Sequence, residues 1–244
     1  MKPFQLLTCI ALFLLSTTLS IAQTGKFGIS VEGGPSFSYI YKNLFPAGDF
    51  KPAVGGYTGV LFDYRFKKHF AFETGLAWEQ KGTQFYKALA SVIYNRQPSA
   101  VENGYTYYAD YTFRFNYLTL PVMVKASFGN KVRFIASGGA YFSLLLSQTY
   151  VSNGHGSFII DPSTYNEKKP YDLGLSGSLG LEIGVMKNAS ISLKFSDHLS
   201  LVNTNMFPIF TMVTGEAVNS DRSSYINSAI VSLGFSWFFG KELK

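Results

Sequence analysis

The segment Ser196-Asp197-His198 carries the three residue types of a hydrolytic triad: a nucleophile, an acid and a base. Adjacent residues of an extended strand point to opposite faces, so this tripeptide cannot itself form a triad. Ser196 and His198 share a face but are too far apart along a strand for a direct hydrogen bond, and no nucleophile elbow surrounds Ser196. The other histidines, His69 and His155, are expected in a short turn and a long loop. We therefore predict no catalytic residues.

Charged residues on one parity of alternating segments form a second candidate site. They are Glu32, Arg65, Glu73, Glu79, Lys81, Lys125, Arg133, Glu182 and Lys194. Both signs occur in similar number, and isolated charges in a narrow interior are costly. We expect a paired and hydrogen-bonded network that fills this interior, and a narrow ion path is the functional alternative.

The elements that position these residues are predicted by strict alternation of apolar and polar side chains. The pattern is clearest from residue 116 to 128, where Leu118 and Leu120 lie on one face and Thr119 on the other. Eight segments show it, at residues 27–39, 57–66, 70–81, 116–128, 132–147, 172–185, 190–196 and 228–239. Their connections alternate between long and short, and we expect strands of about nine to twelve residues.

The loop expected at residues 83–112 contains two features of its own. Phe85, Leu89 and Val92 are spaced as in a short amphipathic helix, and a tyrosine-rich run at 105–111 is expected to extend the strand that follows. The aromatic residues of this loop either anchor a partner or pack on one another, and both interpretations stay open. They are Phe85, Tyr105, Tyr107, Tyr108 and Tyr111.

An even number of strands joined by short turns on one side and long loops on the other is the wiring of an outer-membrane barrel. We therefore predict an all-β fold, an eight-stranded antiparallel up-and-down transmembrane barrel with short periplasmic turns and long extracellular loops. The polar face consists mostly of Ser, Gly and Ala, which suits a crowded interior. A soluble secreted lipocalin-like barrel would also alternate, but its exterior would favour long charged side chains.

Aromatic residues on the apolar face form a predicted girdle at the membrane interfaces. Most lie close to a short turn or a terminus, and Trp78 is near the opposite strand ends. The predicted girdle comprises Phe27, Phe66, Phe70, Phe72, Trp78, Phe128, Phe134, Trp237 and Phe239.

Composition and the N-terminus point to the same compartment. Residues 1–22 read as a cleaved signal peptide, which leaves residues 23–244 as a single barrel domain. Cys9 lies inside the predicted leader, so the mature chain is expected to form neither a disulfide nor a thiolate metal site, and we expect no metal or cofactor. The net charge of +6 comes from scattered bases, which does not predict nucleic-acid binding.

Four segments together resemble the PorT-like outer-membrane beta-barrel family of Bacteroidota. They are FGISVEGG from Phe27, ETGLAWEQKG from Glu73, NYLTLPVMVKASF from Asn116 and VSLGFSWFF from Val231. The resemblance implies a barrel in the outer membrane of a Gram-negative cell envelope. The family's namesake is associated with the type IX secretion and gliding machinery, which makes a secretion-system accessory the nearest specialised role.

The expected function is that of a monomeric, non-enzymatic barrel of structural or interaction type. Its lumen would be plugged by side chains, its wall would contact outer-membrane lipid, and its long loops would meet other envelope proteins. A lipid-modifying outer-membrane enzyme and a soluble secreted ligand-binding barrel are the two alternatives.

Overall fold

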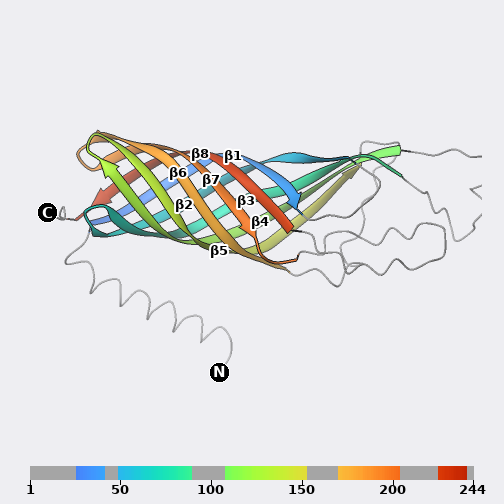
Figure 1. The fold of residues 1–244 in the computed structure, drawn as a ribbon, viewed down its shortest axis with the longest axis horizontal. Helices are drawn as coiled ribbons and strands as arrows, with labels where there is room; N and C mark the ends of the chain where they lie inside the picture. The colour runs from blue at the N-terminus through green and yellow to red at the C-terminus, as the bar shows by residue number, and fades with distance from the viewer. Residues whose placement is uncertain (1–25, 42–48, 90–107, 153–169, 204–224, 241–244) are drawn as a thin grey trace, which may run out of the picture.

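Eight strands form one closed antiparallel barrel in the computed structural model, which describes residues 26–41, 49–89, 108–152, 170–203 and 225–240 (Figure 1). The strands are β1 Lys26–Tyr41, β2 Asp49–Lys67, β3 Phe70–Leu89, β4 Tyr108–Gly129, β5 Val132–Ser152, β6 Tyr171–Met186, β7 Ala189–Ser200 and β8 Tyr225–Phe239. Each strand pairs with its neighbours in the sequence, and β8 closes onto β1. The predicted eight-stranded up-and-down barrel is therefore confirmed.

Three two-residue turns join β2 to β3, β4 to β5 and β6 to β7, where the sequence predicted short turns. They lie at the end of the barrel where β8 finishes (Figure 1). Gly129 is the last residue of β4, directly before the turn to β5, and has a φ of 116°. Residues with a Cβ rarely adopt this conformation. The predicted separation of short turns and long connections between the two ends is confirmed.

The wall inverts the burial pattern of a water-soluble protein. Outward side chains are apolar and exposed; Val31, for example, is 56% exposed and Leu179 is 55% exposed. Inward side chains such as Glu79 and Ser143 are fully buried. The faces predicted from alternation agree with this burial on all eight strands. A surface of this kind is solvated by lipid hydrocarbon rather than by water. No helix in the described part of the chain is long and apolar enough to cross a membrane.

The predicted amphipathic helix is wrong where the structure describes it. Phe85 and Leu89 belong to β3, which runs on to Leu89 and pairs there with Tyr108 and Tyr111 of β4. Tyr108 and Tyr111 of the tyrosine-rich run are the cross-strand partners of this part of β3. The spacing of apolar residues within one segment carries no information about such a partner. Its predicted extension of the following strand is confirmed from Tyr108 onward, whereas Tyr105, Tyr107 and Val92 lie outside the described residues.

The expected strand length was also wrong, because the strands contain 12 to 22 residues. Part of the excess forms a sheet that projects beyond the rest of the barrel (Figure 1). β5 continues to Ser152, although β6 begins opposite Leu144, and β2 begins at Asp49 inside a predicted loop. Hydrogen bonding between neighbouring strands therefore continues past the length that a membrane crossing requires.

Candidate functional site in the barrel interior

All nine charged residues predicted for the interior lie on the inner face. Seven are buried, namely Glu32, Glu73, Glu79, Lys81, Lys125, Glu182 and Lys194. Arg65 and Arg133 are half-buried. The alternation of each strand places them there, and the closure of the sheet brings residues of distant strands together.

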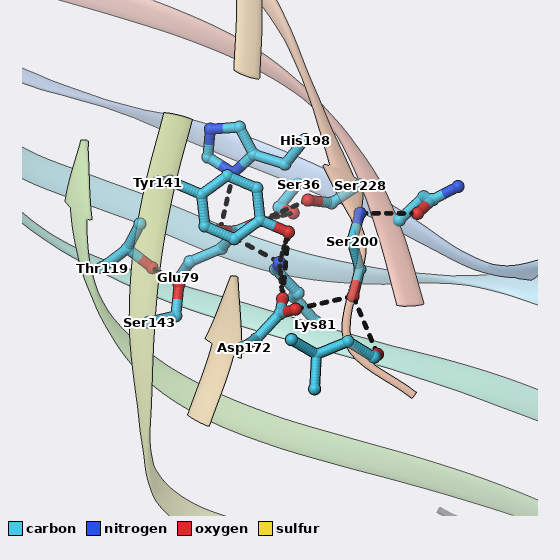
Figure 2. Close-up of polar contacts among 12 residues, drawn as sticks. Ser36, Glu79, Lys81, Thr119, Tyr141, Ser143, Asp172, His198, Ser200 and Ser228 are labelled. Atoms are coloured by element: carbon cyan, nitrogen blue, oxygen red, sulfur yellow. Dashed lines mark hydrogen bonds and ion pairs between the residues drawn. The ribbon is translucent and has the colours of Figure 1, made fainter. Parts of the chain in front are cut away.

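An upper cluster comprises Glu79, Lys81, Tyr141, Asp172 and His198 (Figure 2). It lies toward the strand ends that the long connections join. Lys81 donates from Nζ to Asp172 Oδ2 at 3.0 Å and lies 3.9 Å from Glu79 Oε2. His198 places Nδ1 3.0 Å from Glu79 Oε2. One lysine and one histidine therefore face two carboxylates in a fully enclosed site.

Hydroxyl groups satisfy most of the remaining acceptor positions of the upper cluster. Ser228 donates to Glu79 Oε1, and Ser200 donates to Asp172 Oδ1 at 2.6 Å. Tyr141 donates to Asp172 Oδ2 at 3.0 Å, and its ring stacks on His198 with centroids 4.8 Å apart. Such hydrogen bonds are what permits charged groups to be buried.

The aromatic ring of Tyr141 also fits tightly against the backbone of β6. A Cβ added at Gly174 would come within 2.6 Å of that ring and 2.1 Å of the Leu199 carbonyl oxygen. Glycine at position 174 thus lets β6 and Tyr141 approach each other.

A central cluster comprises Glu32, Asp63, Glu73, Lys125 and Lys194. Lys125 donates to Asp63 at 3.0 Å and to Glu73 at 3.2 Å. Lys194 pairs with Glu32 and lies 3.8 Å from Glu73. The hydroxyl of Tyr57 donates to Glu32 Oε1 at 2.9 Å. Two lysines hold three carboxylates in the middle of the barrel.

A lower pair, Arg133 with Glu182, lies near the short turns. The two residues are direct neighbours on β5 and β6, and Ser190 also donates to Glu182. The guanidinium groups of Arg65 and Arg133 lie 5.4 Å and 5.6 Å from the ring centroid of Phe238, within the range of a cation–π contact.

The clusters cross the lumen rather than following its wall. In the ring order of the strands, β3 lies opposite β7. Two contacts nevertheless join them: Glu73 to Lys194 at 3.8 Å and Glu79 to His198 at 3.0 Å. Side chains of opposite walls therefore meet at two heights of the interior.

Two aspartates and one histidine of these clusters were left out of the predicted network. Asp63, Asp172 and His198 all lie on the inner face, and alternation alone gives that placement. Alternation does not predict which of these residues pair with one another. Asp172, for example, contacts Lys81 only because the sheet closes into a barrel. With these three residues, and among the side chains that the structure describes, six buried carboxylates face five lysines and arginines of the inner face, and His198 adds an imidazole.

The hydrolytic residues considered in the sequence are separated by the structure. Ser196 and His198 face inward, and Asp197 faces outward. His198 contacts Glu79 and Tyr141, and within the described residues no hydroxyl is found in hydrogen bond with its ring. No group of three or more His, Cys, Asp or Glu residues suited to a metal ion occurs among the residues the structure describes.

The residues of the predicted aromatic girdle lie on the outer face. Phe27 is half-buried against Tyr64, with ring centroids 5.1 Å apart, and the other eight are exposed. Phe66 and Phe70 stack across the first short turn. Trp78 lies farther along β3, toward the long connections.

Comparison with known proteins places this barrel in a family. Residues 17–205 match the model of the family described as "Outer membrane protein beta-barrel domain". A search of curated proteins gave no match.

Solved structures show similar barrels at low identity. OprG of Pseudomonas aeruginosa is 12% identical over 90% of this chain and 98% of its own, with a TM-score of 0.43. Neisserial surface protein A is 13% identical over 87% and 97%, with a TM-score of 0.40. Outer membrane protein W of E. coli is 15% identical over 89% and 99%, with a TM-score of 0.35. The family match covers most of the chain and agrees with the closed eight-stranded barrel, so this chain belongs to the outer membrane protein beta-barrel domain family.

Proposed function

We propose that this outer-membrane barrel is a monomeric, non-enzymatic protein of structural or interaction type, with a lumen closed by its own side chains. Its short turns would face the periplasm and its long connections the outside. The observation that carries the proposal is the pair of cross-lumen contacts, Glu73 with Lys194 and Glu79 with His198. An eight-stranded barrel leaves little more than the room that its inward side chains fill.

The arrangement of charges favours a plug over an ion path. A path needs charged groups that face water and exchange partners, because binding in a channel must be weak enough for the ion to leave. Here Lys81, Lys125 and Lys194 are buried and each contacts at least two carboxylates. Breaking these contacts would leave buried charges without partners.

Conductance in planar lipid bilayers tests the closed lumen. The full chain, folded from detergent, is expected to show no steady ion current. Lys194→Met should raise conductance, because it removes a bridge between opposite walls, whereas the outward control Val60→Ala should not. A steady current through the unaltered protein would refute the plug and favour the ion path.

The interaction role would be carried by the long connections, on the side where the sheet of β2 to β5 projects beyond the other strands. The strands of that sheet are longer than a membrane crossing requires, and the excess is on the side of the long connections. Support for a secretion or gliding accessory is the resemblance of four segments to the PorT-like family. Deletion of the gene in its own host should then reduce protein export or gliding, with recovery on complementation. Normal export and gliding in the deletion strain would leave only the general interaction role.

A further inference from the structure

A hollow of about 490 Å³ interrupts the outer, lipid-facing wall between β4 and β7. Its floor is formed by Gly138 and Gly177, which are direct cross-strand neighbours and carry no side chains. Val124, Leu179 and Phe195 stand around it. A Cβ added at Gly138 would meet no atom within 4 Å, so the space is open to an occupant.

Asp197 borders this hollow with an outward carboxylate. Its chain neighbours Ser196 and His198 point into the barrel, and strand alternation turns Asp197 to the outside. Asp197 is half-buried, and its cross-strand neighbours, Gly177 on β6 and Ala229 on β8, carry no group that could pair with it. Within the described ranges, no side chain donates a hydrogen bond to Asp197 and no lysine or arginine pairs with it.

The position of Asp197 makes a carboxylate without a partner costly. On the same face of the same strand, Phe195 on one side is 53% exposed and Leu199 on the other is 42% exposed. Asp197 thus lies within the apolar surface rather than at its edge. Ionisable groups at such positions are rare and commonly have a partner.

We propose that this hollow binds a membrane-embedded segment of another protein that presents a lysine or arginine to Asp197. The two glycines would allow the segment to approach the barrel backbone closely, as small residues do between membrane helices. Charge complementarity favours a cationic partner, because a lysine or arginine both neutralises the carboxylate and donates a hydrogen bond to it in hydrocarbon. The site is on the wall, so it is independent of the loops on which the proposed function relies.

Two other occupants fit the observations less well. A symmetric contact between two copies would bring two Asp197 carboxylates together, and on the described strands the outward cations lie only in the projecting sheet or beside the short turns. A lipid amine resides at the headgroup level, whereas Asp197 is flanked by apolar side chains on both sides.

Energy transfer in phosphatidylcholine vesicles tests the proposal with a defined probe. Cys9 is the only cysteine and lies in the predicted leader, so Lys187→Cys in the mature chain provides one labelling site at a short turn. The probes are two acceptor-labelled Leu/Ala helices of about 20 residues, matched except for one central lysine or leucine. We expect the lysine peptide to associate at least about tenfold more strongly than the leucine peptide.

Three variants of the barrel make the result specific. Asp197→Asn removes the charge, and Gly138→Leu with Gly177→Leu fills the hollow, where added Cβ atoms meet nothing closer than 3.9 Å. Both should reduce binding of the lysine peptide to the level of the leucine peptide. Val60→Leu, a similar enlargement at an outward position on β2, should leave binding unchanged. A gel-mobility shift that disappears on boiling verifies that each variant is folded.

Several outcomes would overturn the proposal. Equal association of the two peptides, or undiminished binding to Asp197→Asn, would show that the carboxylate recruits no cation. Energy transfer between two labelled barrels that depends on Asp197 would assign the hollow to a second copy. Loss of peptide binding when ethanolamine lipid replaces part of the phosphatidylcholine would assign it to a lipid amine.

Discussion

His198 of β7 places its Nδ1 3.0 Å from Oε2 of Glu79 on β3, and this contact joins opposite walls of the barrel. Glu79 is fully buried and also accepts a hydrogen bond from Ser228 of β8. One carboxylate thus links three strands that are not all neighbours. Such a group affects stability more than its size suggests, because its removal leaves several buried partners unsatisfied.

Replacing Glu79 with alanine should lower the free energy of unfolding by about 3–5 kcal/mol, the range found when one partner of a buried ion pair is removed. Lys81 and His198 would lose the same carboxylate. Urea unfolding of the barrel in lipid vesicles, followed by tryptophan fluorescence, measures the loss. Thr58→Ala on the outer face is the control and should change stability by less than about 0.5 kcal/mol. Equal stability of the Glu79 variant and the control would show that the upper cluster is not needed for folding.

Replacing Lys125 with methionine should produce a loss of stability that depends on pH. Asp63 and Glu73 are direct cross-strand neighbours, and both accept hydrogen bonds from Lys125. Without Lys125 the two carboxylates repel each other at neutral pH, and protonation of one of them as the pH falls from neutral to acidic relieves the repulsion. The deficit relative to the unaltered protein should therefore shrink as the pH falls. Unfolding of both proteins across that pH range measures it, and a deficit that does not vary with pH would contradict the pairing.

Two glycine-to-alanine substitutions on neighbouring strands should differ in effect. Gly174→Ala should destabilise the barrel by about 1–3 kcal/mol, because the added Cβ would overlap the ring of Tyr141 and the Leu199 carbonyl. Gly138→Ala is the matched control, since its Cβ enters open space. Unfolding midpoints of the two variants in the same vesicles provide the comparison. Similar midpoints would mean that Tyr141 moves away without cost.

The two tryptophans should report different depths in the membrane. Both are outward, Trp78 with 37% and Trp237 with 42% exposure, but Trp237 lies next to the short-turn end and Trp78 farther along β3. Lipids brominated at different chain positions should quench both, with different depth profiles in Trp78→Phe and Trp237→Phe, each of which retains one tryptophan. Absence of quenching in both variants would be incompatible with lipid contact at these side chains.

Alternation with a period of two is a local property, so residue types alone placed almost every side chain of the barrel on the correct face. Leu118 and Leu120 face outward and Lys125 inward, as the pattern from residue 116 to 128 predicted. The strand number and the short turns also followed from the pattern. Strand ends were less predictable, because β3 continues through Phe85 only where β4 offers a partner.

The sequence by itself therefore determined an eight-stranded barrel with an apolar outside and a charged inside, because each strand carries that information in its own side chains. The tertiary structure decided which charges meet. Asp172 with Lys81 and Glu79 with His198 depend on how the closed sheet aligns distant strands, and closure is a property of all eight strands together. The hollow beside Asp197 arises in the same way, since only the register of β5, β6 and β7 brings Gly138, Gly177 and Asp197 into one row.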